Sequence, residues 1–248
     1  HMEIASLEDL TVGRAGDNDF QLGDDFASSR HARLFRRGSD WFVEDLDSRN
    51  GTFVNGTRVG SAILSEGDVV TIGNVDLVFS GGTLVRRTAT AAATRTGGLE
   101  VNSVTFTVEG GKQLLDHISL TARPGTLTAI IGGSGAGKST LSRLVAGYTT
   151  PSSGVVTFEG HNIHTEYASL RSRIGMVPQD DVVHSRLTVH QALGYAAELR
   201  LPPDTSKADR AQVVSQVLSE LELTKHADTR VDKLSGGQRK RASVALEL

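Results

Sequence analysis

Short apolar runs, each broken by turn residues, follow one another along the first third of the chain. The runs cover residues 10–13, 31–35, 41–44, 51–56, 69–73 and 75–79, and Gly, Asp, Asn or Ser separates them. Each run has the length of a strand, and turn residues at this spacing are typical of an all-β sandwich. Within one run, Asn55-Gly56 predicts a hairpin turn of the primed type.

From residue 99 onward the pattern alternates between strands and helices. We expect an antiparallel pair at residues 101–108 and 114–121, buried strands at 127–131 and 174–179, and another strand at 154–160. Apolar residues at helical spacing predict helices at residues 140–146, 189–199, 207–221 and 239–248. The pattern therefore predicts a sandwich over residues 3–81 and an α/β domain over residues 99–248. A Thr/Ala/Arg-rich linker is expected between them, at residues 82–98.

Composition agrees with two differently built halves. Residues 1–80 hold seven Arg and no Lys against fourteen acidic residues, whereas the rest of the chain carries a net positive charge. The absence of cysteine from all 248 residues excludes disulfides and thiolate chemistry. No signal peptide and no apolar run of about 18 residues is present, so we expect a soluble fragment from the cytoplasmic portion of a protein.

The stretch Gly132-Gly-Ser-Gly-Ala-Gly-Lys-Ser139 matches the spacing of a phosphate-binding loop. Glycines let the backbone N–H groups wrap a phosphate, and the following helix presents its positive end to it. Lys138 would reach the β- and γ-phosphates, and the Ser139 hydroxyl would bind Mg²⁺. We expect ATP contacts from Gly132, Gly133, Ser134, Gly135, Ala136, Gly137, Lys138, Ser139 and Thr140. A chance Gly-rich turn is the alternative, and the expected flanking strand and helix disfavour it.

Three separated pieces of the first half resemble the forkhead-associated (FHA) family. They are Gly13-Arg14, Ser28-x-x-His31, and Ser48-Arg49-Asn50-Gly51-Thr52 with Asn55-Gly56 after it. FHA domains read phosphothreonine peptides, so the resemblance implies that role here. Arg14 and Ser28 suit the three acceptor oxygens and double charge of a phosphothreonine. The resemblance adds Ser29 and the Arg49 backbone as loop contacts and Asn50 as a contact to the peptide main chain, while His31 is expected to brace the loop from inside.

Other interpretations of this half stay open. An isolated Arg14 would be a surface ion pair, and the FHA family usually has strands before its Gly-Arg pair, for which only residues 2–9 remain. The arginines at residues 30, 33, 36 and 37 invite a nucleic-acid interpretation, but the acidic surroundings favour a solvated face, so no nucleic-acid partner is expected. Linker threonines at residues 88, 90, 94 and 96 are either kinase sites or part of a plain tether.

The second half resembles the nucleotide-binding domain of ABC transporters. A phosphate loop is followed by Gln179 and then, after a helical insert, by Leu234-Ser-Gly-Gly-Gln238. The resemblance implies that Gln179 contacts Mg²⁺ or the attacking water, and that it acts in catalysis together with Lys138. It also implies that Ser235, Gly236, Gly237 and Gln238 face the ATP of a second copy, in a head-to-tail homodimer with two ATP molecules between the domains.

Four further stretches of sequence narrow the resemblance to ABCG-type exporters, whose nucleotide domain precedes the membrane domain. They are residues 173–181, 187–189, 196–202 and 237–243. With an FHA domain upstream, the chain resembles an actinobacterial type of exporter. This implies a membrane domain of the same transporter as partner, a phosphothreonine protein such as a Ser/Thr kinase as regulator, and a place at the cytoplasmic face of the plasma membrane. The alternative is a soluble FHA–ABC signalling module that uses nucleotide as a switch. A soluble ABC ATPase that acts on nucleic acid conflicts with the ABCG-like sequence stretches.

Two departures from the ABC pattern affect the expected activity. Val108 stands where many ABC domains place an aromatic ring on the adenine. The Walker B strand with its Asp and Glu, the D-loop and the switch His would follow Leu248, and Asp180-Asp181 cannot substitute because no apolar strand leads directly into them. We therefore expect an incomplete domain that binds ATP weakly and does not hydrolyse it alone. His161-x-x-His164 lacks a third ligand, so no metal site is expected there.

Overall fold

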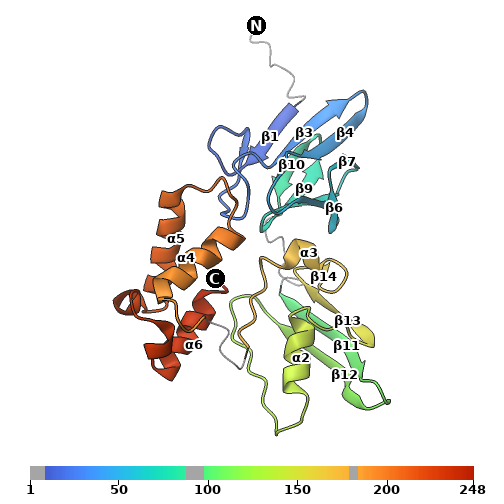
Figure 1. Ribbon diagram of the computed structural model, residues 1–248. Coiled ribbons are helices and arrows are strands. Elements are labelled where there is room, and N and C mark those ends of the chain that lie inside the picture. Colours follow the sequence, from blue (N-terminus) through green and yellow to red (C-terminus); the bar gives the residue numbers. More distant parts are fainter. Residues whose placement is uncertain (1–8, 88–97, 179–183) are drawn as a thin grey trace.

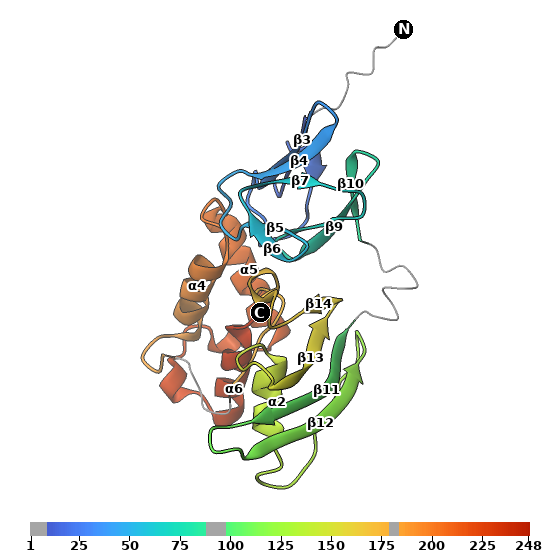
Figure 2. The same ribbon diagram turned by 90° about the vertical axis from the view of Figure 1, so that its right-hand side faces the viewer.

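The computed structural model describes residues 9–87, 98–178 and 184–248. A β-sandwich forms one end of the molecule (Figure 1). Beneath the sandwich lie a further sheet with its helix and, beside them, a group of helices from the last quarter of the chain (Figures 1 and 2). The chain therefore divides into three packed parts.

The sandwich consists of two five-stranded sheets. The first has the order β2-β1-β3-β4-β7 and contains β1 (Asp9–Gly13), β2 (Phe20–Gln21), β3 (Ala32–Arg37), β4 (Asp40–Asp45) and β7 (Ser61–Leu64). The second has the order β10-β9-β8-β5-β6 and contains β5 (Thr52–Val54), β6 (Thr57–Val59), β8 (Val69–Ile72), β9 (Val75–Ser80) and β10 (Thr83–Arg86). Alternate residues of both sheets fill the core, with Leu34, Val43, Val70, Ile72 and Leu77 fully buried.

The predicted runs all contain strands, and the predicted primed turn is confirmed because Asn55 and Gly56 both have positive φ angles, 48° and 78°. The expected linker is corrected at its start. Strand β10 lies inside residues 82–98, pairs with β9 and buries Leu84 against the sandwich core. The sandwich therefore extends past residue 81, while residues 88–97, with the linker threonines, lie outside the described part.

The third sheet, outside the sandwich, is antiparallel and has the order β12-β11-β13-β14. Its strands are β11 (Leu99–Thr107), β12 (Gln113–Ala122), β13 (Ser153–Phe158) and β14 (His161–Asn162), followed by the short helix α3 (Tyr167–Leu170). Helix α2 (Lys138–Val145) packs on this sheet, and Leu144 joins Val101, Val104, Val156 and Ile163 in a shared core. We call this part the core subdomain.

The remaining helices have an apolar core of their own, formed by Val189, Leu193, Val214, Leu218 and Leu223 among others. They are α4 (Val189–Arg200), α5 (Lys207–Glu220), the 3-10 turns η1 (Thr224–His226) and η2 (Val231–Lys233), and α6 (Gly236–Ala245). We call this part the helical subdomain. Helix α6 begins at Gly236, earlier than the predicted residue 239, because Ser235 caps it.

Two predicted buried strands are wrong. Residues 127–131 and 174–178 have no strand structure, and the side chains of Leu127 and Ile131 are 99% and 93% exposed. A strand is stabilised by the neighbour that completes its hydrogen-bond ladder, and no described segment pairs with either stretch. Apolar composition alone therefore does not make these segments strands. The last residue of the second stretch, Gln179, lies outside the described part.

No helix in the described ranges is both long and apolar enough to cross a lipid bilayer.

Candidate functional sites

The glycine-rich loop of residues 132–139 leads into the N-terminus of α2. Gly137 is the residue before the helix and has a φ of 89°, and a Cβ there would lie 3.0 Å from the Leu114 carbonyl oxygen. Gly135 also has a positive φ, of 80°. The sequence thus places glycine where the backbone turns in a way that other residues resist. Lys138, the first residue of α2, folds back over this turn.

The ammonium group of Lys138 is held by the loop itself. Its Nζ donates to the carbonyl oxygens of Gly132 and Gly133 at 2.7 and 2.6 Å. Ser139 lies beside it at the surface of a hollow of about 790 Å³, which Tyr148, Met176 and Pro178 also line. The Lys138 ammonium, the N-terminus of α2 and the N–H groups of the exposed loop therefore meet at one opening, which is an arrangement that attracts anions.

Helix α6 reaches the same hollow from the helical subdomain. Lys240 lines it and donates from Nζ to the Pro178 carbonyl oxygen at 2.6 Å. This contact joins α6 to the residue that precedes Gln179, which itself lies outside the described part. The structure thus brings Lys138, Ser139 and α6 to one region.

The segment Leu234-Ser-Gly-Gly-Gln238 forms the capped start of α6. The Ser235 hydroxyl accepts the Gln238 N–H at 3.3 Å, and the Gln238 side chain accepts the Ser235 N–H at 2.9 Å. This reciprocal pair is a capping box. Gly236 and Gly237 are exposed in the first turn, where helical N–H groups have no partner four residues earlier.

A second candidate site lies at one end of the sandwich, around Arg14. The Arg14 Nε donates to the Ala27 carbonyl oxygen at 3.1 Å, and its backbone N–H donates to that of Ser28 at 3.0 Å. The guanidinium group also lies 3.4 Å from the Ser29 hydroxyl. The Arg14 side chain is only 18% exposed, so these bonds hold its charge at a fixed place between the loops.

Buried His31 fixes the loop that faces Arg14. Its Nδ1 accepts the Ser28 N–H at 3.1 Å and its Nε2 lies 3.0 Å from the Gly51 carbonyl oxygen. Because Nδ1 is an acceptor, the proton sits on Nε2, and the ring is neutral. Burial lowers the pKa of His31, although the Gly51 bond and nearby carboxylates oppose the shift. The predicted bracing role of His31 is confirmed.

The remaining residues predicted in this pocket have different exposures. Ser28 is buried, and its hydroxyl accepts the Arg49 N–H at 3.1 Å. The Asn50 side chain donates to the Phe26 carbonyl oxygen at 2.8 Å, which ties two loops together. Ser29 and the Arg49 side chain face an open pocket of about 670 Å³. The five predicted residues are therefore brought together, with Ser28 and Asn50 engaged in holding the loops.

A carboxylate from the helical subdomain lies in this pocket. Asp204, in the loop between α4 and α5, accepts the Ser29 N–H at 2.5 Å and the Arg14 guanidinium at 3.1 Å. The Thr205 hydroxyl lies 3.4 Å from the same guanidinium nitrogen. Burial tends to raise the pKa of Asp204, but the bonds from Ser29 and Arg14 outweigh it and lower that pKa.

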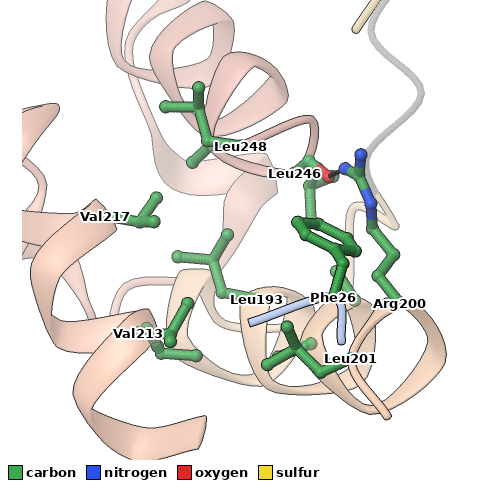
Figure 3. A pocket seen from close by; sticks show the side chains of 12 residues that line it. Phe26, Leu193, Arg200, Leu201, Val213, Val217, Leu246 and Leu248 are labelled. Carbon is green, nitrogen blue, oxygen red and sulfur yellow. Dashed lines mark hydrogen bonds between the residues drawn. The ribbon is translucent and has the colours of Figure 1, made fainter. Parts of the chain in front are cut away.

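Phe26, from the loop beside this pocket, makes an apolar contact with the same subdomain. Its ring lies near Leu193, Leu201 and Leu246 (Figure 3), and Val214 lines the same small hollow. Arg200 borders this contact and donates to the Leu246 carbonyl oxygen at 2.7 Å. The helical subdomain thus meets the sandwich through both a charged and an apolar contact.

The sandwich meets the core subdomain at another place, through Asp76 of β9. The Asp76 carboxylate accepts Arg173 at 2.7 and 3.2 Å and lies 3.0 Å from His161 Nε2. On its other side, His161 Nδ1 lies 3.0 Å from Glu166. Burial opposes ionisation of Asp76, yet the bonds from His161 and Arg173 lower its pKa strongly, and the bond to Asp76 raises the pKa of His161. We call Asp76, His161 and Arg173 the ionic contact.

Similarity to known proteins identifies both parts of the chain. The ABC transporter family model matches residues 115–248, which is more than half of the chain. The chain belongs to the ABC transporter family. The FHA domain model matches residues 10–73, so this ABC transporter chain carries an FHA domain ahead of its nucleotide-binding part. The predicted fold class, an FHA sandwich followed by an ABC-type nucleotide-binding domain, is confirmed.

Relatives of this ABC transporter chain include a mycobacterial protein. The chain is 68% identical over 96% of its length to the ABC transporter ATP-binding/permease protein Rv1747 of Mycobacterium tuberculosis, of which it spans 28%. It is 39% identical over 60% of its length to ABC transporter G family member 22 of Arabidopsis thaliana, of which it spans 20%. The structure of cbiO1 from Clostridium perfringens, described as part of the ABC transporter complex cbiONQ, matches with a TM-score of 0.56 and 30% identity over 60% of each chain. The chain thus spans less than a third of these two curated relatives.

Sequence patterns did not point to several residues of the two sites. Asp204 and Thr205 belong to no motif, and only the fold brings them to Arg14. His161 and His164, considered as a ligand pair, serve elsewhere: His161 joins the ionic contact, and the His164 ring lies 3.0 Å from the Leu144 carbonyl oxygen. Lys240 follows the Leu-Ser-Gly-Gly-Gln motif, and its position in the first turns of α6 is the signal that links it to this site.

Proposed function

We propose that this chain is the ATP-binding region of an exporter that couples ATP binding and hydrolysis to transport across the plasma membrane. One observation carries the proposal: a Lys-bearing glycine loop at the start of α2 and the capped glycine pair at the start of α6 occur in one ABC-family chain. Each is a helix N-terminus with exposed N–H groups, which suits the phosphates of a nucleotide. The relatives in the G family of ABC transporters agree with the ABCG-type resemblance, from which export is inferred as the direction of transport.

The loop residues fit a triphosphate. Positive φ angles at Gly135 and Gly137 turn the backbone around the Lys138 ammonium, and that ammonium donates to the carbonyl oxygens of Gly132 and Gly133. Phosphate oxygens would replace these carbonyls with a stronger charge-assisted bond. In this proposal residues 132–140 contact ATP, and Ser139 and Gln179 hold Mg²⁺, which would neutralise phosphate charge. Val108 lies in the turn between β11 and β12 and offers no aromatic ring for the adenine.

A second copy of the chain completes each site in this proposal. Ser235, Gly236, Gly237 and Gln238 would face the ATP held by the partner copy, because their exposed first turn is itself an anion site. Lys138 and Gln179 would act in hydrolysis. A membrane domain is proposed as the further partner, with this region at the cytoplasmic face. The described residues hold no evident base for the attacking water, so we propose that the chain alone binds ATP and hydrolyses it poorly.

For the FHA domain we propose phosphothreonine-peptide binding at Arg14. The pocket already accommodates an anion, since Arg14 and Ser29 both donate to one carboxylate. A phosphothreonine offers more charge and one more acceptor oxygen to the same donors. The Arg49 backbone would be a further loop contact and Asn50 would hold the peptide main chain, and a phosphorylated Ser/Thr kinase is the class of partner that fits this chemistry.

The first test is titration with Mg-ATP of the wild type and of Lys138→Ala. Loss of a charge-assisted bond to phosphate lowers affinity by about tenfold or more. Lys207→Ala, which removes an exposed lysine at the start of α5, is the matched control and keeps wild-type affinity. Equal ATP affinity in the Lys138 variant and the wild type would disprove the assigned loop.

The second test concerns the sandwich alone. Arg14→Ala is expected to lower affinity for a phosphothreonine peptide by about tenfold to a hundredfold, because it removes the charged donor to the phosphate. ATP affinity stays at the wild-type value, since the two sites lie on separate parts. The exposed Arg36, on β3, provides the control variant Arg36→Ala. A phosphopeptide that bound the Arg14 variant and the control equally would remove Arg14 from the site.

A further inference from the structure

The donors at Arg14 and Ser29 already have a partner from the helical subdomain of the same chain. The Asp204 carboxylate uses both oxygens: one accepts the Ser29 N–H and the other accepts the Arg14 guanidinium. Pro203 and Asp204 line the pocket together with the FHA loop residues Ser28, Ser29 and Arg49. The two donors that we assign to a phosphothreonine therefore already donate to an acidic side chain.

The loop that carries Asp204 is held firmly in this position. Pro202 and Pro203 restrict its backbone, and Ser206 ends it by capping α5 through the Asp209 N–H at 3.0 Å. Thr205 is buried beside the Arg14 guanidinium, and Asp209 places a second carboxylate 4.0 Å from it. The loop thus presents Pro203, Asp204 and Thr205 to the FHA recognition loops from a turn that the Thr205 N–H closes on the Pro202 carbonyl oxygen at 3.0 Å.

The apolar hollow that Phe26 lines together with Leu193, Leu201 and Val214 lies next to this charged contact. Because Asn50 holds the Phe26 carbonyl, the loop that carries Phe26 is tied to the loops that form the pocket. Occupation of the pocket and docking of the helical subdomain are therefore parts of one contact.

We propose that Asp204 is an internal ligand of the FHA pocket, so that a phosphothreonine peptide binds only by displacing the helical subdomain from the FHA domain. The inference rests on the proposed phosphothreonine function of Arg14. A carboxylate has one negative charge and two acceptor oxygens, whereas a phosphothreonine has about two charges and three oxygens, so the peptide forms the stronger bonds. The tethered carboxylate competes because its local concentration is high, in the millimolar range for a short connection.

Linkage gives the proposal a functional consequence. If peptide binding requires undocking, every factor that favours the docked state weakens the peptide by the same factor. A phosphorylated partner would then free α4, α5 and α6 from the sandwich, and these helices include the proposed ATP-facing turn of α6. The FHA domain thereby controls how the helical subdomain moves.

The experiment compares peptide affinity in the wild type and in Asp204→Ala. The probe is a fluorescent peptide pool with a central phosphothreonine and varied flanks, and the same pool with plain threonine is its control. Removing the internal carboxylate is expected to tighten binding about tenfold, since one charge-assisted competitor is lost. Asp228→Ala, an exposed aspartate of the same subdomain, keeps the wild-type affinity. Asp204→Asn, which keeps the shape without the charge, is expected to follow Asp204→Ala.

A distance measurement follows docking directly. Because the sequence has no cysteine, Ser39→Cys on the sandwich and Ser219→Cys on α5 accept one label each. The phosphothreonine pool is expected to separate the labels in the wild type, and Asp204→Ala is expected to separate them without peptide.

The possible results separate the internal role of Asp204 from the phosphothreonine binding at Arg14. Arg14-dependent binding of equal strength in the wild type and Asp204→Ala, with unchanged label distance, overturns the internal ligand and leaves the phosphothreonine function standing. No phosphate-dependent binding even in Asp204→Ala overturns the phosphothreonine function and the inference with it. Tighter binding in Asp204→Ala that is lost again in Arg14→Ala/Asp204→Ala supports both.

Discussion

Gly13, the last residue of β1, shows how closely the Arg14 pocket is built onto the sandwich. A Cβ at residue 13 would lie 2.3 Å from the Ser29 carbonyl oxygen. That oxygen also accepts the Ala15 N–H and the Asn18 side chain, so it is fixed from two other sides. The glycine therefore allows the Arg14 strand end and the Ser29 loop to touch, and this contact sets the width of the pocket.

Gly13→Ala is expected to destabilise the sandwich by about 2 kcal/mol, because the backbone at Ser29 must move to admit a methyl group. Gly23→Ala is the matched control: it has open space around the new methyl group and should change stability by less than about 0.5 kcal/mol. Urea unfolding followed by the fluorescence of Trp41, the chain's single tryptophan, measures both. Similar unfolding midpoints for the two variants would contradict the close contact.

His31 gives the sandwich a pH dependence of known sign. The pKa of His31 is lowered from 6.5 by burial, so the unfolded chain binds the proton more readily than the folded one. Its contribution to stability is complete above pH 6.5 and is lost as the pH falls below that value. Urea midpoints at pH 7.5 and 5.5 test this, and His31→Phe is expected to remove the loss in that window. A midpoint in the wild type that rose toward acid pH would contradict the buried neutral ring.

At the scale of elements, the capping box of Ser235 and Gln238 determines where α6 begins. Ser235→Ala removes the side-chain acceptor of the cap and is expected to destabilise the helical subdomain by about 1 kcal/mol. Ser235→Asp keeps a good cap and is expected to keep the wild-type stability. Urea unfolding followed by circular dichroism compares the two variants, and equal losses in both would show that the cap is not what Ser235 contributes to stability.

Elements with local signals were predicted well from the sequence, and elements that depend on distant partners were not. Turn residues such as Asn55-Gly56 and the helical spacing around Leu193 and Val214 carry their own information, so the sandwich and the helices could be expected. Residues 127–131 are as apolar as a strand, but strand structure depends on the neighbour, and the spacing of apolar residues says nothing about that neighbour. Strand β10 was missed for the opposite reason, because its polar neighbours resemble a linker.

The candidate sites divide in the same way. Arg14, Ser28 and the loop around Lys138 belong to motifs whose spacing is local, and the structure brings each set together. Asp204 lies 190 residues from Arg14 in the chain, and an isolated aspartate after two prolines carries no mark of its partner. Contacts between folded parts depend on how whole surfaces fit, and that information is absent from short stretches of sequence.

At the scale of the whole molecule, the ionic contact couples the sandwich to the core subdomain. Breaking a pair buried as deeply as Asp76 and Arg173, which are 8% and 7% exposed, leaves a charge without its partner. His161 adds a titrating group, and the charged groups that face it or share its partners are Asp76, Glu166, Arg173, Arg87 and Glu159. Docking of the two parts is therefore expected to depend on pH.

The sign follows from the raised pKa of His161, which its bond to Asp76 causes. The contribution of the charged ring is complete below pH 6.5 and is lost as the pH rises through the raised value. Labels at Ser39→Cys and Thr150→Cys are expected to separate more at alkaline pH in the wild type. His161→Gln is expected to remove this pH dependence, whereas His164→Gln, whose ring contacts the Leu144 carbonyl inside the core subdomain, keeps it. A separation that ignored pH, or that followed His164, would exclude His161 as the titrating group.

The FHA domain touches both other parts of the chain, Asp204 on one and His161 with Arg173 on the other. It therefore links the helical subdomain and the core subdomain through two separate contacts, one at Arg14 and one at Asp76 of β9. If the helical and core subdomains rotate relative to each other, the sandwich cannot keep both contacts, so one of the two contacts must break. The contact that breaks first determines whether the sandwich stays with the helical or with the core subdomain. A ligand that weakens only one contact therefore selects which subdomain the sandwich leaves.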